Sequence, residues 1–200
     1  FRRVLFRSYV EGSVKTQERL RRGCSEKLLL EGLNTRKPAD FKLFLQNNDN
    51  KKQLFKLMLR VWSSEEAAKR LRHKKLMLVV EGKAFLLTST DGKSVKQTEI
   101  ESLKSNQEET DTRVVLYLIH AEQQGYRYAV VHSPDSDIFF ILLYHIHKLN
   151  DLIVLLDTGT GEHRRLLNIN EIASDLGARY CETLLGLYCF TGEDCNCHSR

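Results

Sequence analysis

The strongest constraint on how this chain folds is a regular alternation of helical and strand-like patterns in its second half. Two apolar stretches there, Y-A-V-V at 128–131 and L-I-V-L-L at 152–156, are short and carry no charge. Runs of this kind are typical of parallel strands buried on both faces of a sheet. The segments predicted in this half are helices at 108–124, 136–148 and 170–186, strands at 127–132 and 152–156, and a hairpin strand at 164–169 after the T-G-T-G turn at 158–161. We therefore expect an α/β fold with a mainly parallel central sheet and helices on both faces.

The first half has a different pattern, in which helices come first and a hairpin follows. Spacing and capping signals predict helices at 13–22, 41–46, 51–62 and 63–73, and then a β-hairpin from Leu76–Val80 and Ala84–Thr88. The chain thus divides into a basic helical region at 13–75, a hairpin at 76–90 and an acidic α/β part at 108–200. Since 42% of the 200 residues are hydrophobic, one packed core can form, and we expect a single domain over 1–200.

Charge is distributed unevenly along the chain. Residues 1–75 carry 20 Lys and Arg against 8 Asp and Glu, whereas residues 76–200 carry 11 against 18. A basic half suits a phosphate-bearing partner, and clustered carboxylates suit hard metal ions. The alternative is that both halves are ordinary solvated surfaces.

Several features predict a location inside the cell, in the cytosol or the nucleus, without a membrane partner. The longest apolar stretches, 138–144 and 152–156, are much shorter than the ~20 residues that a bilayer span needs. Residues 1–7 lack the apolar core of a signal peptide. Five Cys is an odd number, which favours reduced thiols over a disulfide framework.

Both ends of the chain favour a fragment. It begins with Phe1 and not with Met, and residues 197–200 carry no helix end or turn signal. The L-F-R-S at 5–8 matches what a common sequencing-adapter tail would encode, so an artefactual origin is one interpretation of residues 1–8. We expect a domain that is truncated at both ends.

Two carboxylates follow the first predicted strand of the acidic part. Asp135 and Asp137 come directly after the strand that ends at 131–132, at the carboxyl edge of the sheet, where such folds bind ligands. They are two residues apart where a loop turns into a helix, so both can face one point. A helix N-cap is the alternative interpretation of this pair. A D-x-D after a strand also occurs in nucleotide-sugar glycosyltransferases, which is a second alternative.

Further acidic residues lie at two other element boundaries. Glu108, Glu109 and Asp111 open the helix before that strand, where a favourable interaction with the helix dipole is the alternative explanation. Asp194 follows the apolar helix end at 184–190. Three such clusters could hold two Mg²⁺ or Mn²⁺ ions about 4 Å apart, an arrangement that activates water and stabilises the leaving oxygen of a phosphodiester.

The order of these motifs along the chain carries a resemblance. The chain has E-T-D at 109–111, S-P-D-S-D at 133–137 and F-T-G-E-D at 190–194. This order resembles the E-x-E, D-x-D and G-x-D pattern of the flap-endonuclease and PIN-like 5′ nucleases. The chain is more closely similar to a transposon-associated animal group with the motifs E-E-A-D-T-R, S-P-D-T-D, T-G-T-G-x-H-R and F-T-G-C-D-T-T. That group's S-I-K-x-x-E-R-x-R-R-G matches 13–23, so the likeness covers nearly the whole chain.

The resemblance implies a PIN-like three-layer domain and a metal-dependent nuclease that hydrolyses phosphodiester bonds in DNA or RNA. The residues that it implies as metal ligands are Glu109, Asp111, Asp135, Asp137 and Asp194, with Glu108 as a further candidate. Lys15 and Arg22 lie two helical turns apart and match the basic pair that such nucleases aim at the scissile phosphate. A solvated helix face is the alternative for these two residues.

Two departures from the group's motifs bear on activity. Where the group has V-F-D-x-Y, this chain has F-R-S-Y at 6–9, which places Arg7 in the position of an acidic ligand. After Asp194, the group's T-T-S is replaced by C-N-C at 195–197. A missing ligand favours a second function, in which the chain is a catalytically degenerate PIN-like module that binds nucleic acid or protein through its basic half.

Overall fold

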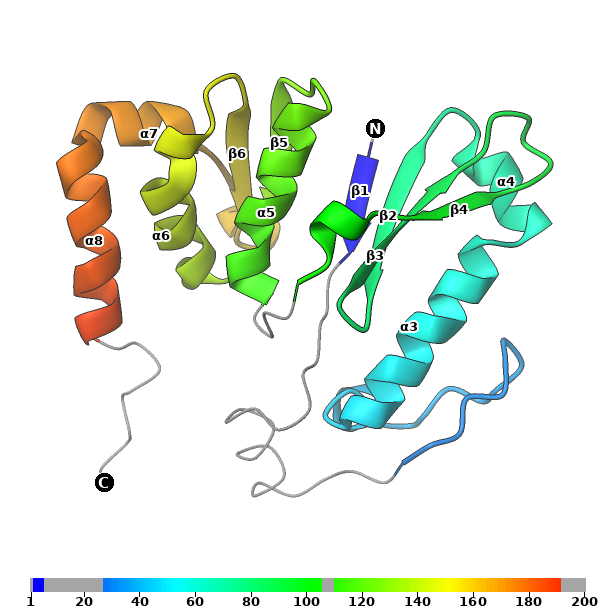
Figure 1. Cartoon of the computed structure of the whole chain (residues 1–200). Helices are drawn as coiled ribbons and strands as arrows, with labels where there is room; N and C mark the ends of the chain where they lie inside the picture. Colours follow the sequence, from blue (N-terminus) through cyan, green and yellow to red (C-terminus); the bar gives the residue numbers. More distant parts are fainter. Residues whose placement is uncertain (1, 6–26, 106–109, 192–200) are drawn as a thin grey trace, which may run out of the picture. The chain divides into compact units, whose positions relative to one another are not determined.

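The computed structural model describes residues 2–5, 27–105 and 110–191, which form a mixed α/β structure with two small sheets (Figure 1). Contacts within the chain divide it into two compact units, Phe1–Thr110 and Asp111–Arg200. One mainly parallel central sheet is therefore not confirmed, and the single domain stays a prediction. Within these residues, no helix combines the length and the apolar character that crossing a membrane requires.

The sheet of the first unit has four strands in the order β1-β2-β3-β4. They are β1 (Arg2–Leu5), β2 (Lys75–Val80), β3 (Lys83–Thr88) and β4 (Lys96–Glu99). β1 pairs in parallel with β2, and the other neighbours pair antiparallel. The predicted hairpin is confirmed as β2 and β3. The sequence patterns predict neither β1 nor β4, and β4 is polar, so it has no apolar run to mark it.

The α-helices that the structure describes in the first unit begin where the sequence supplies a capping side chain. They are α2 (Phe41–Phe44), α3 (Asn48–Trp62) and α4 (Glu65–Leu71), followed by the short 3₁₀ helix η1 (Glu101–Leu103). The side chains of Asp40, Asn47 and Ser64 each accept a hydrogen bond from a backbone N–H of the following turn. Leu59 and Trp62 on α3 pack against the buried apolar cluster of this unit.

The sheet of the second unit has three strands in the order β5-β6-β7. They are β5 (Tyr128–His132), β6 (Ile153–Thr158) and β7 (Arg165–Asn168). β5 and β6 are parallel, with His132 opposite Asp157, so the residues that follow both strands lie at one edge of the sheet. β6 and β7 form the predicted antiparallel hairpin. Gly159 makes its turn possible, because a Cβ at this position would collide with the carbonyl oxygen of His163.

Among the described residues of this unit, four α-helices and two short 3₁₀ helices flank the sheet. The helical segments are α5 (Thr110–Gln123), α6 (Ser136–His145) with η2 (Ile146–Lys148), η3 (Gly161–His163), α7 (Ile169–Leu176) and α8 (Ala178–Thr191). The continuous helix predicted at 170–186 is wrong, because Gly177 separates α7 from α8 with a φ of 81° and a ψ of 153°. The predicted helices at 108–124 and 136–148 correspond to α5 and to α6 with η2.

The helices bury one face of the three-stranded sheet. Val154 and Leu156 of β6 belong to an apolar cluster that includes side chains from α5, α6, α7 and α8, and Val131 of β5 packs against it. On the opposite face of β5, Tyr128 is 68% exposed and Val130 is 61% exposed. Burial of this strand on both faces and the predicted three-layer arrangement are therefore not confirmed.

Candidate metal centre

The loop between β5 and α6 is shaped by local hydrogen bonds that start from its own side chains. The backbone N–H of Asp135 donates to the hydroxyl of Ser133 over 3.1 Å. Asp135 is the N-cap of α6, and its carboxylate accepts from the backbone N–H of Asp137 over 3.2 Å. The capping interpretation of Asp135 is therefore confirmed, and the same geometry places Asp137 in the first turn of the helix.

Three carboxylates of the second unit converge at the start of α6. Asp111 lies in the first turn of α5, and it joins Asp135 and Asp137 in a group whose ligand oxygens all lie within 4.8 Å of one another. Asp135 is exposed, and the other two are half-buried. The two segments that supply these residues are separated in sequence by all of β5, so the convergence is a property of the fold.

The chemistry of this group fits a divalent cation. Carboxylate oxygens are the donors that hard cations such as Mg²⁺ and Mn²⁺ prefer. Three carboxylates at such short separations also repel one another, and a cation among them would offset that repulsion. Asp111, Asp135 and Asp137 could therefore hold a metal ion.

Tyr188 on α8 contacts this centre from another helix. Its hydroxyl donates to Oδ1 of Asp137 over 2.5 Å and lies 3.1 Å from the hydroxyl of Ser136. Its ring stacks on Phe140 of α6, with 4.1 Å between ring centroids and an interplanar angle of 23°. The last turns of α8 are thereby fixed to the first turns of α6, beside the carboxylates.

A second polar network lies where β5 and β6 end. Asp157, which is almost fully buried, accepts two hydrogen bonds from the Arg164 guanidinium, over 2.7 and 2.8 Å, and lies 3.2 Å from Nδ1 of His132. The hydrogen bonds from Arg164 contribute most to holding the pKa of Asp157 below its ordinary value, and the contact with His132 lowers it further. The backbone carbonyl of Asp157 accepts from the N–H of Ser133 over 3.1 Å. Asp157 therefore anchors the start of the loop that carries Asp135 and Asp137.

Four of the predicted site residues lie outside the described residues. Lys15 and Arg22, predicted to act on the phosphate, and Glu109 and Asp194, predicted as metal ligands, belong to the segments 6–26, 106–109 and 192–200. Glu108 and Arg7 also lie in these segments. Their roles stay predictions, while the other three predicted ligands are the ones that the structure brings together.

The sequence patterns assign no role at the site to Tyr188, Asp157 or Arg164. Tyr188 lies in the apolar run at 184–190, where an aromatic side chain is first interpreted as core. Arg164 is the last residue of the T-G-T-G-x-H-R motif, and Asp157 immediately precedes that motif. The opposite charges of Asp157 and Arg164 on the two sides of this turn are the local feature of the sequence that indicates an ion pair.

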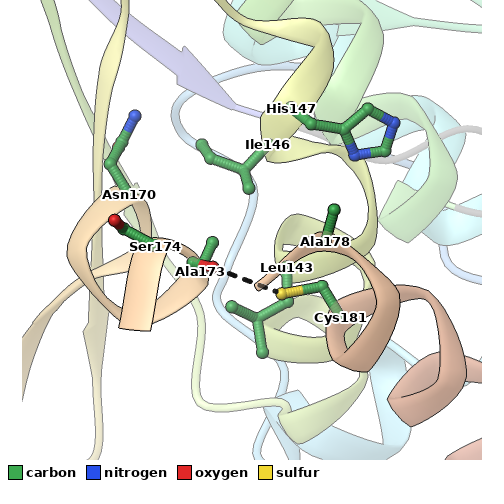
Figure 2. Close-up of a pocket in the computed structure, with 8 residues that line it drawn as sticks. All are labelled: Leu143, Ile146, His147, Asn170, Ala173, Ser174, Ala178 and Cys181. Carbon is green, nitrogen blue, oxygen red and sulfur yellow. Dashed lines mark hydrogen bonds between the residues drawn. The ribbon is translucent and has the colours of Figure 1, made fainter. Parts of the chain in front are cut away.

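A pocket of about 250 Å³ lies elsewhere in the second unit, at the other end of α6 (Figure 2). Leu143 and Ile146 line it from α6 and η2, and the remaining lining residues come from η2, α7 and α8. Figure 2 shows the Cys181 thiol directed toward the carbonyl oxygen of Ala173, with which it forms a hydrogen bond of 3.8 Å. The pocket is mostly apolar and contains none of the three clustered carboxylates.

Comparison of the chain with protein-family models, with curated proteins and with solved structures gives no match. The chemistry of the candidate centre is therefore argued from its own residues and their geometry.

Proposed function

We propose that this chain is a PIN-like, metal-dependent nuclease domain that hydrolyses phosphodiester bonds in DNA or RNA. The observation that carries the proposal is the convergence of Asp111, Asp135 and Asp137 within 4.8 Å. The three residues follow one another along the chain in the order of the 5′-nuclease motifs. In the proposed site, Glu109 and Asp194 complete the ligand set for two Mg²⁺ or Mn²⁺ ions.

The residues of the chain have distinct roles in this proposal. The carboxylate oxygens of Asp111, Asp135 and Asp137 hold the cations. When bound, Mg²⁺ or Mn²⁺ ions activate water and stabilise the leaving oxygen of the phosphodiester. Lys15 and Arg22 neutralise the charge of the phosphate. The excess of Lys and Arg in residues 1–75 supports a nucleic acid partner, because phosphate contacts supply most of the affinity for such ligands.

Cleavage assays with paired variants test the proposal. The full chain is incubated with end-labelled single-stranded DNA, flapped DNA and single-stranded RNA, in Mn²⁺, Mg²⁺ or EDTA. We expect cleavage that depends on the cation and that falls at least about a hundredfold in Asp135→Asn/Asp137→Asn, because metal coordination contributes several kcal/mol to the transition state.

The matched control is Asp175→Asn, which removes an exposed carboxylate of α7 outside the cluster. Equal cleavage by the wild type and by Asp135→Asn/Asp137→Asn would show that the assignment is wrong. Salt-sensitive binding without cleavage would indicate the degenerate binding module. Hydrolysis or transfer of a nucleotide sugar would indicate the glycosyltransferase alternative.

A further inference from the structure

The hydroxyl of Tyr188 occupies a position between two residues of the α6 N-terminus. It lies 2.5 Å from Oδ1 of Asp137 and 3.1 Å from the hydroxyl of Ser136. The tyrosine comes from α8, more than fifty residues later in the chain, and stacking on Phe140 fixes the plane of its ring. Packing therefore sets where this hydroxyl lies.

The direction of these hydrogen bonds follows from the number of protons. A carboxylate oxygen only accepts, so the phenolic proton of Tyr188 is donated to Asp137. Because Tyr188 has no second hydroxyl proton, Ser136 must donate to the phenolic oxygen. The result is a directed chain from Ser136 through Tyr188 to Asp137, in which each hydrogen bond polarises and strengthens the next.

We infer that Tyr188 is a positioning residue for Asp137, an inference that rests on the proposed function. Mutual repulsion in the cluster favours rotation of Asp137 away from Asp111 and Asp135. A donor held at Oδ1 opposes that rotation and keeps the carboxylate oriented before a cation binds. Hydrogen-bonded partners of ligating side chains orient those ligands and tune affinity in metal sites generally.

A purely structural role for Tyr188, as a link between α6 and α8, makes a different prediction. If the hydroxyl only stabilised the packing of the two helices, its removal would lower the stability of the metal-free protein and leave the intrinsic cation affinity unchanged. Phe at this position retains the ring that stacks on Phe140. Tyr188→Phe therefore removes the hydroxyl and keeps the packing of the ring, so the effects of the two can be measured separately.

The test is a calorimetric titration of the full chain with Mn²⁺, for the wild type, Tyr188→Phe and the control Tyr180→Phe. Tyr180 lies on the same helix and is 68% exposed. We expect Tyr188→Phe to bind Mn²⁺ about tenfold more weakly, the lower end of the effects found for such supporting residues. Tyr180→Phe should bind as the wild type does. Thermal unfolding in EDTA measures separately how much the lost hydrogen bond lowers the stability of the metal-free protein.

Each outcome has a definite meaning. Equal or tighter Mn²⁺ binding by Tyr188→Phe, with the wild type binding normally, overturns the positioning role and leaves the metal centre intact. A wild type that does not bind Mn²⁺ overturns the metal centre and the positioning role together. Should Tyr188→Phe fail to fold, Ser136→Ala removes the donor behind Tyr188 and keeps the ring. We expect a smaller loss of affinity in that variant, and no loss would overturn the inference.

Discussion

At the scale of single residues, we expect Asp157 to make the stability of the protein depend on pH. Its carboxylate is almost fully buried and accepts two hydrogen bonds from Arg164, which lower its pKa in the folded protein. A group with a lowered folded pKa stabilises the protein at pH values above its unfolded pKa, near 3.9, and loses that contribution as the pH falls through its folded pKa. The Asp157–Arg164 pair is therefore expected to stabilise the second unit at neutral pH and not in strong acid.

We predict that Asp157→Asn lowers the unfolding temperature at pH 7 and that its difference from the wild type shrinks as the pH falls below about 4. In acid, the wild-type carboxyl becomes neutral and resembles the amide of the variant. Thermal unfolding followed by circular dichroism over a pH series measures this difference. Arg164→Gln should remove the same pH-dependent contribution to stability. A difference in unfolding temperature between Asp157→Asn and the wild type that stays constant down to pH 2 would contradict the prediction.

Among the secondary structure elements, the boundary between α7 and α8 depends on one backbone conformation. Gly177 has a φ of 81° and a ψ of 153°, a combination that is essentially restricted to glycine. An added Cβ at Gly177 would meet no heavy atom within 4 Å, so crowding does not contribute. The requirement for glycine comes from the backbone alone.

We predict that Gly177→Ala lowers the free energy of unfolding by about 1–3 kcal/mol. The matched variant is Gly186→Ala, in the interior of α8, where an added Cβ also has open space. Alanine is the better helix former, so this variant should be more stable than the wild type by about 0.5–1 kcal/mol. Urea unfolding measures both, and a shift of the same sign in the two variants would contradict this account of the helix break.

The same two glycines show why the elements could be predicted only in part. Gly177 and Gly186 both interrupt an apolar helical pattern, yet only the first ends a helix. Helix starts were predictable to within three residues, because caps such as Asn47 and Asp135 bond to backbone groups two or three residues away. The helix predicted to begin at 51 begins at Asn48. Sheet membership was not, because the parallel pairing of β1 with β2 joins distant segments.

The candidate site shows the same division between local and distant information. The strand, loop and helix that present Asp135 and Asp137 follow directly from a short stretch of sequence. The order of motifs predicted that Asp111 would join them. The contact of Tyr188 with Asp137 depends on how α8 packs on α6, which no periodicity in the sequence specifies.

For the whole molecule, cation binding and folding stability are linked. A ligand that binds only the folded chain raises the free energy of unfolding, by about 2.7 kcal/mol at a free concentration one hundred times its Kd. The proposed centre exists only in the folded state, because Asp111 is brought to Asp135 and Asp137 by the fold. Mn²⁺ should therefore stabilise the wild type against urea, relative to EDTA.

We predict that this gain is lost in Asp135→Asn/Asp137→Asn and kept in Asp175→Asn. Asn is as good an N-cap as Asp, so the start of α6 should survive the exchange at Asp135. Urea unfolding monitored by fluorescence, with and without Mn²⁺, measures the gain in each protein. An equal gain in both variants would place the cation outside the cluster. Another outcome is a stability gain that is confined to proteins with the intact cluster while no nucleic acid is cleaved. That result would mean that the chain binds the cation and does not catalyse the reaction. Binding a cation needs fewer correctly placed groups than hydrolysing a phosphodiester.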